Sequence, residues 1–269
     1  MNDPTVDTGR NLETQIHPTA ILDPDAELGV GVVIGPWSII GPKVVIGDGT
    51  AIGPHVLVEE STTIGADCRL SQGAVLGTDP QDLKYSGEQT ALTVGDRTVI
   101  REYATLNRGT AASGKTTVGD DCLLMAYSHV AHDSIIGNSV VLANAVNMAG
   151  HVVIEDWATV GGLTAIHQFV RIGAHAFVGG ASRTSQDVPP YTRGAGSPMK
   201  LYGLNAVGLE RRGFSLEVRK ALKQAYRLVF QSNMNTSQGV ETAFGQVEAF
   251  PEVRHFLTFI RDSQRGVTT

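Results

Sequence analysis

The sequence predicts an all-β solenoid followed by a small α-helical domain. An aliphatic residue recurs at every sixth position from Val118 to Val178, and a run in the same pattern extends from Ile16 to Leu76. The chain has 31 glycines but only 6% aromatic residues, which suits a fold with a tight turn every few residues. A period of six fits neither a 3.6-residue helix nor a simple hairpin array.

Three hexapeptides would complete a triangular coil of 18 residues, with the aliphatic residues pointing inward and the coils stacked about 4.8 Å apart. Glycine directly follows many of the aliphatic residues, as at Gly35 and Gly47, and we expect it to supply the backbone freedom that a corner needs. Cys68 and Cys122 fall on small inward positions. They are therefore expected to be reduced core residues rather than a disulfide or a metal pair.

Two segments interrupt the period. The segment 78–93 places Asp82 where an aliphatic residue is expected, and the segment 108–117 is rich in glycine and threonine. We expect both to leave the solenoid as loops, where solenoids tend to carry their binding groups. The solenoid itself is predicted over 16–190, after a polar and unpatterned flexible tail at 1–15.

Residues 191–269 are predicted to form a linker and a helical domain. The paired prolines Pro189 and Pro190 are expected to stop strand pairing, and the glycine-rich segment 191–213 is typical of a linker. Ser215 is suited to cap a helix, with Glu217 in its first turn. Apolar residues with helical spacing follow at Val218, Ala221, Leu222, Ala225, Leu228, Val229, Val240, Phe244, Val247, Val253, Phe256, Leu257 and Ile260.

The overall charge and hydropathy exclude two classes of protein. A net charge of −6 argues against general nucleic-acid binding. No apolar stretch of about 18 residues is present, so no integral membrane segment is expected. The N-terminus also lacks a signal-peptide pattern, and we expect a cytoplasmic protein.

The 18-residue coil brings several polar residues to one face. His132, Gly150 and Gln168 are 18 residues apart and should stack on one line, and Asp133 and His151 should form the adjacent line. Asp133 is the expected orienting partner of His132. Such a cluster is what a catalytic or metal site needs.

Two further histidines adjoin this cluster. His129 lies three residues before His132, and His167 immediately precedes Gln168. A lone outward histidine on a solenoid is usually a solvated surface residue, whereas several on one face indicate a function. The histidines expected to be ordinary surface residues are His17, His55, His175 and His255.

Five segments together resemble the UDP-N-acetylglucosamine O-acyltransferase family, which belongs to the hexapeptide-repeat acyltransferases. They are HVAHDSIIGNSVVLANAVNMAGHV, QDLKYSGE, GGLTAIHQFVRIGAHAFVGG, SQDVPPY and RRGFS, and the similarity extends from residue 16 to about residue 264. The resemblance implies a left-handed parallel β-helix, although the usual crossover rule favours the right hand. It also implies a homotrimer with no cofactor and no bound metal.

The resemblance implies transfer of an (R)-3-hydroxyacyl chain from acyl carrier protein to the 3-hydroxyl of UDP-N-acetylglucosamine, the first step of lipid A biosynthesis. His132 would be the general base, Asp133 would orient it or bind the sugar, and the N–H of Gly150 would stabilise the oxyanion. Gly180 would set the acyl-chain length, because a glycine leaves room for a longer chain. The residues implied to contact the substrate are Asp82, Lys84, His129, His151, His167, Gln168, Asn205, Arg211 and Arg212.

One position departs from the family pattern. Between Asn205 and the arginine pair, where a glutamate is expected to contact the ribose, this chain has Val207. We therefore expect weaker nucleotide binding. Neither the preferred acyl length nor the choice between UDP-N-acetylglucosamine and a 3-amino analogue as acceptor follows from the sequence.

Three alternatives were weighed. The related N-acyltransferase of the same pathway carries an extra N-terminal domain, for which hexapeptides starting at Ile16 leave no room. A zinc-dependent carbonic anhydrase could use His129, His132 and His151 as ligands, but it would give the C-terminal helices no role. A non-catalytic solenoid would show a ladder of threonines on one flat face, and the sequence has none.

Overall fold

The computed structural model describes residues 13–269, and residues 1–12 lie outside the described part. Most of the tail predicted over 1–15 is therefore not described. Its last residue already belongs to strand β1 (Gln15–Ile16), so the first strand begins one residue before the predicted start of the solenoid.

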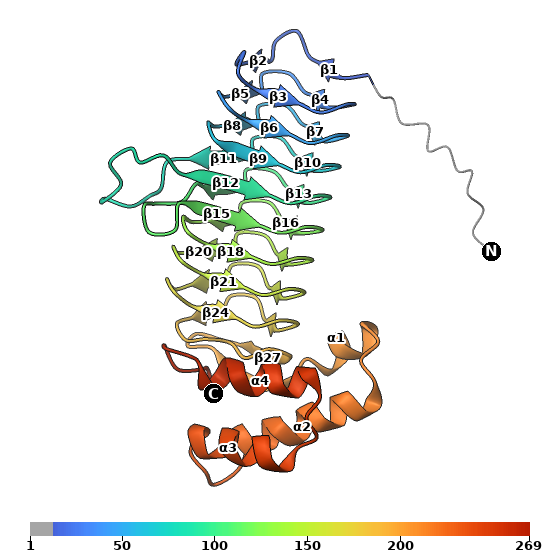
Figure 1. Ribbon diagram of the computed structural model, residues 1–269, viewed down its shortest axis with the longest axis vertical. Helices are drawn as coiled ribbons and strands as arrows, with labels where there is room; N and C mark the ends of the chain where they lie inside the picture. Colours follow the sequence, from blue (N-terminus) through green and yellow to red (C-terminus); the bar gives the residue numbers. More distant parts are fainter. Residues whose placement is uncertain (1–12) are drawn as a thin grey trace, which may run out of the picture.

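The described residues form a tall stack of coils that ends in a group of helices (Figure 1). Each coil contributes one short strand to each of three sheets. The first sheet contains β1, β4 (Val33–Ile34), β7 (Ala51–Ile52), β10 (Arg69–Leu70), β13 (Val99–Ile100), β16 (Leu123–Leu124), β19 (Val141–Leu142), β22 (Thr159–Val160), β25 (Phe177–Val178), β27 (Thr192–Ala195) and β28 (Lys200–Leu204). The second contains β2 (Ile21–Leu22), β5 (Ile39–Ile40), β8 (Leu57–Val58), β11 (Val75–Thr78), β14 (Thr105–Asn107), β17 (His129–Val130), β20 (Asn147–Met148), β23 (Ala165–Ile166) and β26 (Arg183–Thr184). The third contains β3 (Glu27–Leu28), β6 (Val45–Ile46), β9 (Thr62–Ile64), β12 (Ala91–Val94), β15 (Lys115–Val118), β18 (Ile135–Ile136), β21 (Val153–Ile154) and β24 (Arg171–Ile172).

The strands pair in parallel with an offset of one coil. Ile34 pairs with Ile52, and Ile52 pairs with Leu70, so the repeat is 18 residues. The aliphatic ring forms the core, with Ile34 and Ile52 each 2% exposed. The predicted left-handed parallel β-helix with a helical C-terminal region is confirmed.

The glycines that follow the aliphatic residues do not act as predicted. The left-handed backbone conformation occurs two residues later, where Trp37 has a φ of 61°. Gly35 is required for a different reason: a Cβ built on it would lie 2.7 Å from the carbonyl carbon of Gly53 in the next coil. The backbones of stacked coils approach too closely at this position for any side chain.

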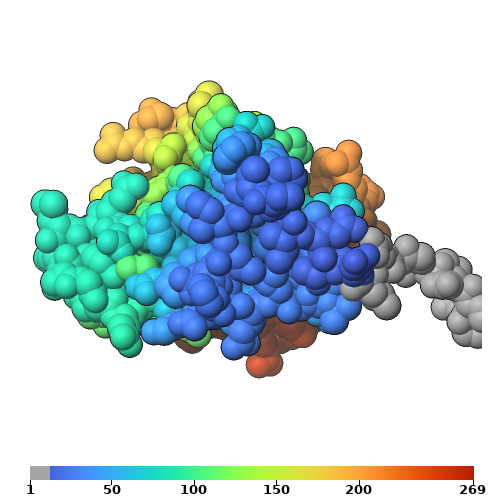
Figure 2. All heavy atoms as spheres, turned by 90° about the horizontal axis from the view of Figure 1, so that it is seen from above, coloured from blue at the N-terminus to red at the C-terminus, as the bar shows by residue number. Residues whose placement is uncertain are grey.

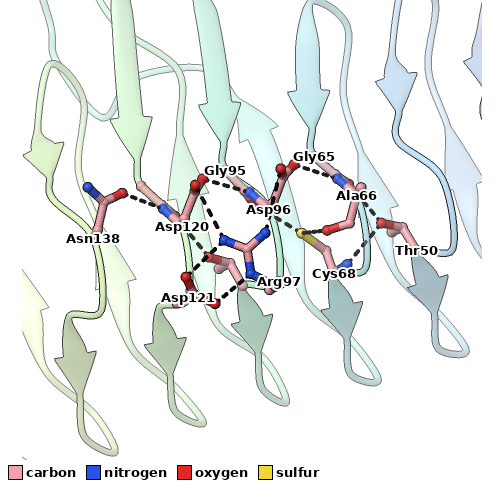
Figure 3. Close-up of polar contacts among 12 residues, drawn as sticks. Thr50, Gly65, Ala66, Cys68, Gly95, Asp96, Arg97, Asp120, Asp121 and Asn138 are labelled. Carbon is pink, nitrogen blue, oxygen red and sulfur yellow. Dashed lines mark hydrogen bonds and ion pairs between the residues drawn. The ribbon is translucent and has the colours of Figure 1, made fainter. Parts of the chain in front are cut away.

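Another edge of the solenoid is held by a ladder of carboxylate and amide oxygens (Figure 3). Asp96 accepts a hydrogen bond from the backbone N–H of Ala66 at 2.8 Å, and Asp120 accepts one from the N–H of Asp96 at 2.9 Å. Arg97 lies between these acids, with Nε 2.7 Å from Asp121. The ladder satisfies turn N–H groups that the sheets leave unpaired.

Both cysteines lie inside the coils as predicted. Cys68 and Cys122 are free and buried. The thiol of Cys68 donates to the carbonyl of Gly95 at 3.0 Å (Figure 3). Burial raises the pKa of the Cys122 thiol to about 11, so it stays protonated at neutral pH.

Two loops leave the coils. The first loop (79–90) connects β11 to β12, and the second loop (108–114) connects β14 to β15. Both are shorter than the predicted 78–93 and 108–117, because their ends extend the flanking strands and pair with neighbouring coils. The first loop protrudes beyond the stack both from the side (Figure 1) and from above (Figure 2).

The prediction that 191–213 is a linker is wrong. β27 continues the first sheet in parallel with β25 and forms an antiparallel hairpin with β28, after which helix α1 (Ala206–Arg211) begins. Pro189 and Pro190 do not stop pairing, because they lie between β26 and β27, where no strand N–H is needed.

Three longer helices follow: α2 (Leu216–Phe230), α3 (Thr236–Gln246) and α4 (Pro251–Arg261). Ser215 caps α2 as predicted, accepting a hydrogen bond from the N–H of Val218 at 3.2 Å. Phe244 is 37% exposed rather than buried, and Arg261 lies over its ring. None of the described helices is both long and apolar enough to cross a membrane.

Two histidines that were expected to be solvated instead join the helices to the solenoid. His255 on α4 lies 2.9 Å from Glu155 through Nε2 and 3.0 Å from the hydroxyl of Tyr191 through Nδ1. His175 is stacked between Trp157 and Tyr191, and burial lowers its pKa to about 4. Both predictions failed because each histidine meets a partner that is distant in sequence.

Candidate active site

His132 and Asp133 form a hydrogen-bonded pair at a corner of the solenoid, just after β17. Asp133 has a φ of 58°, which is the left-handed corner conformation. Its side chain is completely buried, and its Oδ2 lies 2.8 Å from Nδ1 of His132. A neutral His132 that donates from Nδ1 leaves Nε2 with a lone pair, which is the arrangement of a general base.

Asp133 also anchors the second loop. Its carboxylate accepts hydrogen bonds from the N–H of Thr110 at 2.9 Å, from the hydroxyl of Thr110 at 2.7 Å and from the hydroxyl of Ser113. Burial alone would raise the pKa of Asp133, but the hydrogen bonds from Ser113, His132 and Thr110 outweigh it and hold the pKa well below its usual range. Asp133 is therefore a fixed negative charge beside His132.

His151 lies one coil further along, on the line of Asp133. Its ring is perpendicular to that of His132 at a centroid distance of 5.1 Å, and its Nε2 lies 3.8 Å from Oδ2 of Asp133. Phe169 stacks on the other side of His151 at 4.5 Å. Phe169 was not predicted, although it follows His151 by 18 residues. Its ring restricts the orientation of the His151 imidazole.

Gly150 lies directly against His132. A Cβ built on Gly150 would lie 2.5 Å from Cε1 and 2.6 Å from Nε2 of the imidazole. Within the described part of the chain, no acceptor takes the backbone N–H of Gly150. This N–H is thus a free donor close to the free nitrogen of His132, as an oxyanion site requires.

The other residues of this face surround the pair at different distances. His129 bonds the hydroxyl of Thr105 at 2.7 Å through Nδ1, and its pKa is lowered by burial and by the nearby His132. Gln168 is exposed and lies one coil beyond Gly150. His167 is also exposed, and its Nδ1 lies 3.2 Å from Nη2 of Arg265 near the C-terminus. The sequence offered no signal for that last contact.

The predicted substrate residues of the first loop are held in a turn. The N–H of Lys84 donates to Oδ1 of Asp82 at 3.0 Å, and the N–H of Tyr85 donates to the carbonyl of Asp82 at the same distance. Within the described part of this chain, neither Asp82 nor Lys84 contacts the His132–Asp133 pair. The loop presents them away from the coils instead (Figure 1).

Asn205, Arg211 and Arg212 lie together in a groove of about 830 Å³ that is also lined by Arg193 and Val207. Asn205 caps α1 by accepting from the N–H of Gly208 at 3.2 Å. Arg212 lies over the ring of Trp157 at 5.3 Å, and burial lowers its pKa. The groove has the two guanidinium groups that a diphosphate would need.

A metal centre fits this geometry poorly. The ligand atoms of His132, Asp133 and His151 all lie within 4.8 Å of one another. However, the Asp133 carboxylate already accepts bonds from Thr110, Ser113 and His132, and a metal ion would have to break some of them. His129, the third ligand in the carbonic anhydrase alternative, is not part of this set. The donors favour a base with an orienting carboxylate over a zinc site.

Comparison with known proteins decides the family. The model described as "Udp N-acetylglucosamine O-acyltransferase; Domain 2" matches residues 187–268, and the bacterial transferase hexapeptide model matches 43–78 and 115–150. The acyl-[acyl-carrier-protein]–UDP-N-acetylglucosamine O-acyltransferase of Alkalilimnicola ehrlichii is 54% identical over 94% of this chain and 99% of its own. The chain belongs to the UDP-N-acetylglucosamine O-acyltransferase family.

Other members of this family agree in sequence and in fold. The enzyme of the same name from Pseudomonas entomophila is 48% identical over 95% of this chain and 99% of its own. The solved UDP-N-acetylglucosamine O-acyltransferase of Moraxella catarrhalis superposes with a TM-score of 0.91 at 41% identity, covering 94% of this chain and 99% of that one. The UDP-N-acetylglucosamine acyltransferase of Francisella novicida gives a TM-score of 0.92 at 35% identity, with 94% of each chain covered.

The residues expected from this family lie at three different corners of the solenoid. Asp133 and His151 mark the first corner, Trp157 beside Arg212 marks the second, and Gly180 precedes the third at Ala181. The structure thus brings the predicted residues together in subsets. A single chain does not bring them all to one place.

Proposed function

We propose that this chain transfers an (R)-3-hydroxyacyl group from acyl carrier protein to the 3-hydroxyl of UDP-N-acetylglucosamine, the first step of lipid A biosynthesis. The observation that carries the proposal is the pairing of His132 with the buried Asp133 at 2.8 Å, beside the free N–H of Gly150, in a chain of this family. The names of the relatives state the donor and the acceptor.

His132 acts as the general base in this proposal. Nε2 takes the proton of the sugar 3-hydroxyl while the oxygen attacks the thioester carbonyl, and Asp133 stabilises the imidazolium that forms. The N–H of Gly150 donates to the oxyanion of the tetrahedral intermediate. When the intermediate collapses, the carbon–sulfur bond breaks and His132 returns the proton to the leaving thiolate. No cofactor is needed, because every proton and electron pair is accounted for.

The nucleotide is proposed to bind in the groove of Asn205, Arg211 and Arg212, because a guanidinium fork matches phosphate oxygens and Arg212 is partly buried. The sugar and acyl chain would be held by the remaining predicted residues. These are Asp82, Lys84, His129, His151, His167 and Gln168.

We further propose a homotrimer. A substrate that contacts His132, Arg212 and Gly180 needs groups from three corners of the coil, and a cyclic arrangement lets different corners of adjacent chains face each other. The first loop protrudes far enough to approach a neighbouring chain (Figure 2). Sedimentation equilibrium tests this assembly, and a monomer at assay concentration would contradict it. A cytoplasmic location follows from the proposed substrates.

The test of the function is acyl transfer from a panel of 3-hydroxyacyl carrier proteins to UDP-N-acetylglucosamine and its 3-amino analogue. We expect transfer by the wild-type chain and a loss on the order of 100-fold in His132→Ala, because general-base catalysis contributes that much. His17→Ala, which changes an exposed histidine on the second coil, is the control. Full activity in His132→Ala would refute the base, and no transfer from any donor would refute the function.

A further inference from the structure

Arg108 is a nearly buried arginine, only 9% exposed, for which the proposed chemistry has no role. It follows β14 and begins the second loop, yet its side chain reaches into the first loop. Nε and Nη2 donate to the hydroxyl of Tyr85 at 3.2 and 3.0 Å, and Nη2 also pairs with the carboxylate of Asp79. Nη1 donates to the carbonyl of Gly77 at 3.3 Å. A buried cation with this many partners is expensive to leave unpaired, so the arrangement is strongly specified.

The neighbouring residue secures the start of the same loop. Nδ2 of Asn107 donates to the hydroxyl of Thr78 at 2.9 Å and to the carbonyl of Asp79 at 2.8 Å. Asn107 thus fixes the point where the chain leaves the coil, and Arg108 fixes the middle of the loop through Tyr85. The first loop has few other contacts with the solenoid, as its outward course indicates (Figure 1).

Tyr85 closes the turn that carries the two predicted substrate residues. Its backbone N–H donates to the carbonyl of Asp82 at 3.0 Å, and its hydroxyl donates to the carbonyl of Glu88 at 3.0 Å. The Tyr85 hydroxyl can accept from Arg108 while it donates to Glu88. Arg108 therefore determines where Asp82 and Lys84 lie relative to the solenoid, through one aromatic side chain.

The second loop is fixed at its other end by the catalytic carboxylate. Thr110, two residues after Arg108, donates to Asp133 from both its N–H and its hydroxyl at 2.9 and 2.7 Å. Arg108 and Thr110 thus connect the first loop to the His132–Asp133 pair through a short segment whose two ends are both anchored.

We propose that Arg108 is a positioning residue that holds the first loop, and with it Asp82 and Lys84, in the conformation that binds the nucleotide-sugar acceptor. The inference rests on the proposed function, which assigns Asp82 and Lys84 to substrate binding. Arg108 touches no reacting atom in this mechanism. Its loss costs acceptor binding, because the loop must then pay the entropy of ordering when the substrate arrives.

The test compares Arg108→Met and Arg108→Lys with wild type. Arg108→Met should raise the KM for UDP-N-acetylglucosamine by about tenfold while kcat changes much less, since the interaction removed organises binding rather than the reacting groups. Arg108→Lys, which keeps the charge but loses the fork, should fall between the two. The matched control is Arg97→Met, because Arg97 also bridges carboxylates but lies on the solenoid wall. A KM within twofold of wild type in folded Arg108→Met would overturn the proposal.

A second readout does not require activity. Hydrogen–deuterium exchange of residues 79–90 should accelerate in Arg108→Met and stay unchanged in Arg97→Met. If wild type transfers no acyl group, the proposed function fails, while the exchange data still decide whether Arg108 holds the loop. Unchanged exchange would refute that role. Should Arg108→Met not fold, Tyr85→Phe removes only the accepting hydroxyl and should change exchange and KM in the same direction; no change in either would refute the proposal.

Discussion

Gly150 lies so close to His132 that a single added methyl group would collide with the imidazole, at 2.5 Å from Cε1. The relationship connects two stacked coils, since His151, the residue after Gly150, also donates its N–H to the carbonyl of His132 at 3.0 Å. The position of the proposed base is thus set by the backbone of the next coil.

Gly150→Ala should therefore displace the imidazole and lower kcat on the order of 100-fold, because a shift of about 1 Å in a catalytic group costs that much. The measurement is steady-state transfer together with the thermal unfolding midpoint. Gly245→Ala is the control, since no atom lies within 4 Å of its added Cβ. Activity within twofold of wild type in Gly150→Ala would show that His132 is not constrained in this way.

Asp133→Asn should destabilise the fold at neutral pH by about 1–3 kcal/mol, because a buried acceptor loses its charge and one of its oxygens. The pKa of Asp133 is depressed in the folded chain, whereas an unfolded aspartate titrates near pH 4. Its stabilisation is therefore fully present above about pH 4 and is lost as the pH falls toward the folded pKa.

Urea unfolding of wild type and Asp133→Asn at pH 7 and below pH 4 measures this effect. The difference between the two proteins should shrink at the lower pH. Asp25→Asn, which changes an exposed carboxylate, should show no comparable difference at either pH. A gap that widens on acidification would contradict the sign of the shift.

Val207→Glu should strengthen nucleotide binding. Val207 lines the groove of Arg211 and is 59% exposed, so a longer side chain can be accommodated. A carboxylate there can accept from the ribose hydroxyls, and one such bond is worth about 1 kcal/mol, or roughly a fivefold lower KM for UDP-N-acetylglucosamine. Val207→Ala is the control, and an equal KM in both variants would remove the ribose contact from the proposal.

Gly180→Met should shorten the preferred acyl chain. A Cβ at this position would lie 3.2 Å from the carbonyl oxygen of Gly162, so a larger side chain extends outward into the space proposed for the acyl chain. Each methylene that no longer fits forfeits about 0.8 kcal/mol. Competition between 3-hydroxyacyl carrier proteins of different lengths measures the preference, with Gly180→Ala as an intermediate case. An unchanged preference would show that Gly180 is only a corner residue.

The catalytic stack could be predicted by counting, and the loop anchors could not. His132, Gly150 and the adjacent Asp133 and His151 follow from an 18-residue repeat that holds without drift across strands β17 to β23. The partners of Arg108 and the second role of Asp133 lie in segments without a period. Nothing in the spacing of Asp79, Tyr85 or Thr110 indicates which side chain they meet.

Two errors have the same physical origin. The glycines after the aliphatic residues were assigned to backbone freedom, whereas Gly35 is required by the approach of Gly53 in the next coil. The segment 191–213 was assigned to a linker, whereas its strands complete the first sheet. In both cases a neighbour from another coil, rather than the local sequence, decides the conformation.

The sequence by itself determined the coil, its aliphatic core and the line that joins His132 to Gly150, because a regular repeat makes lateral neighbours a matter of arithmetic. Only the tertiary structure decided the corner geometry, the hairpin before α1, the attachment of the helices through His255 and the link from Arg108 to both loops. These contacts join residues without a common period, and they depend on where side chains point once the coils have stacked.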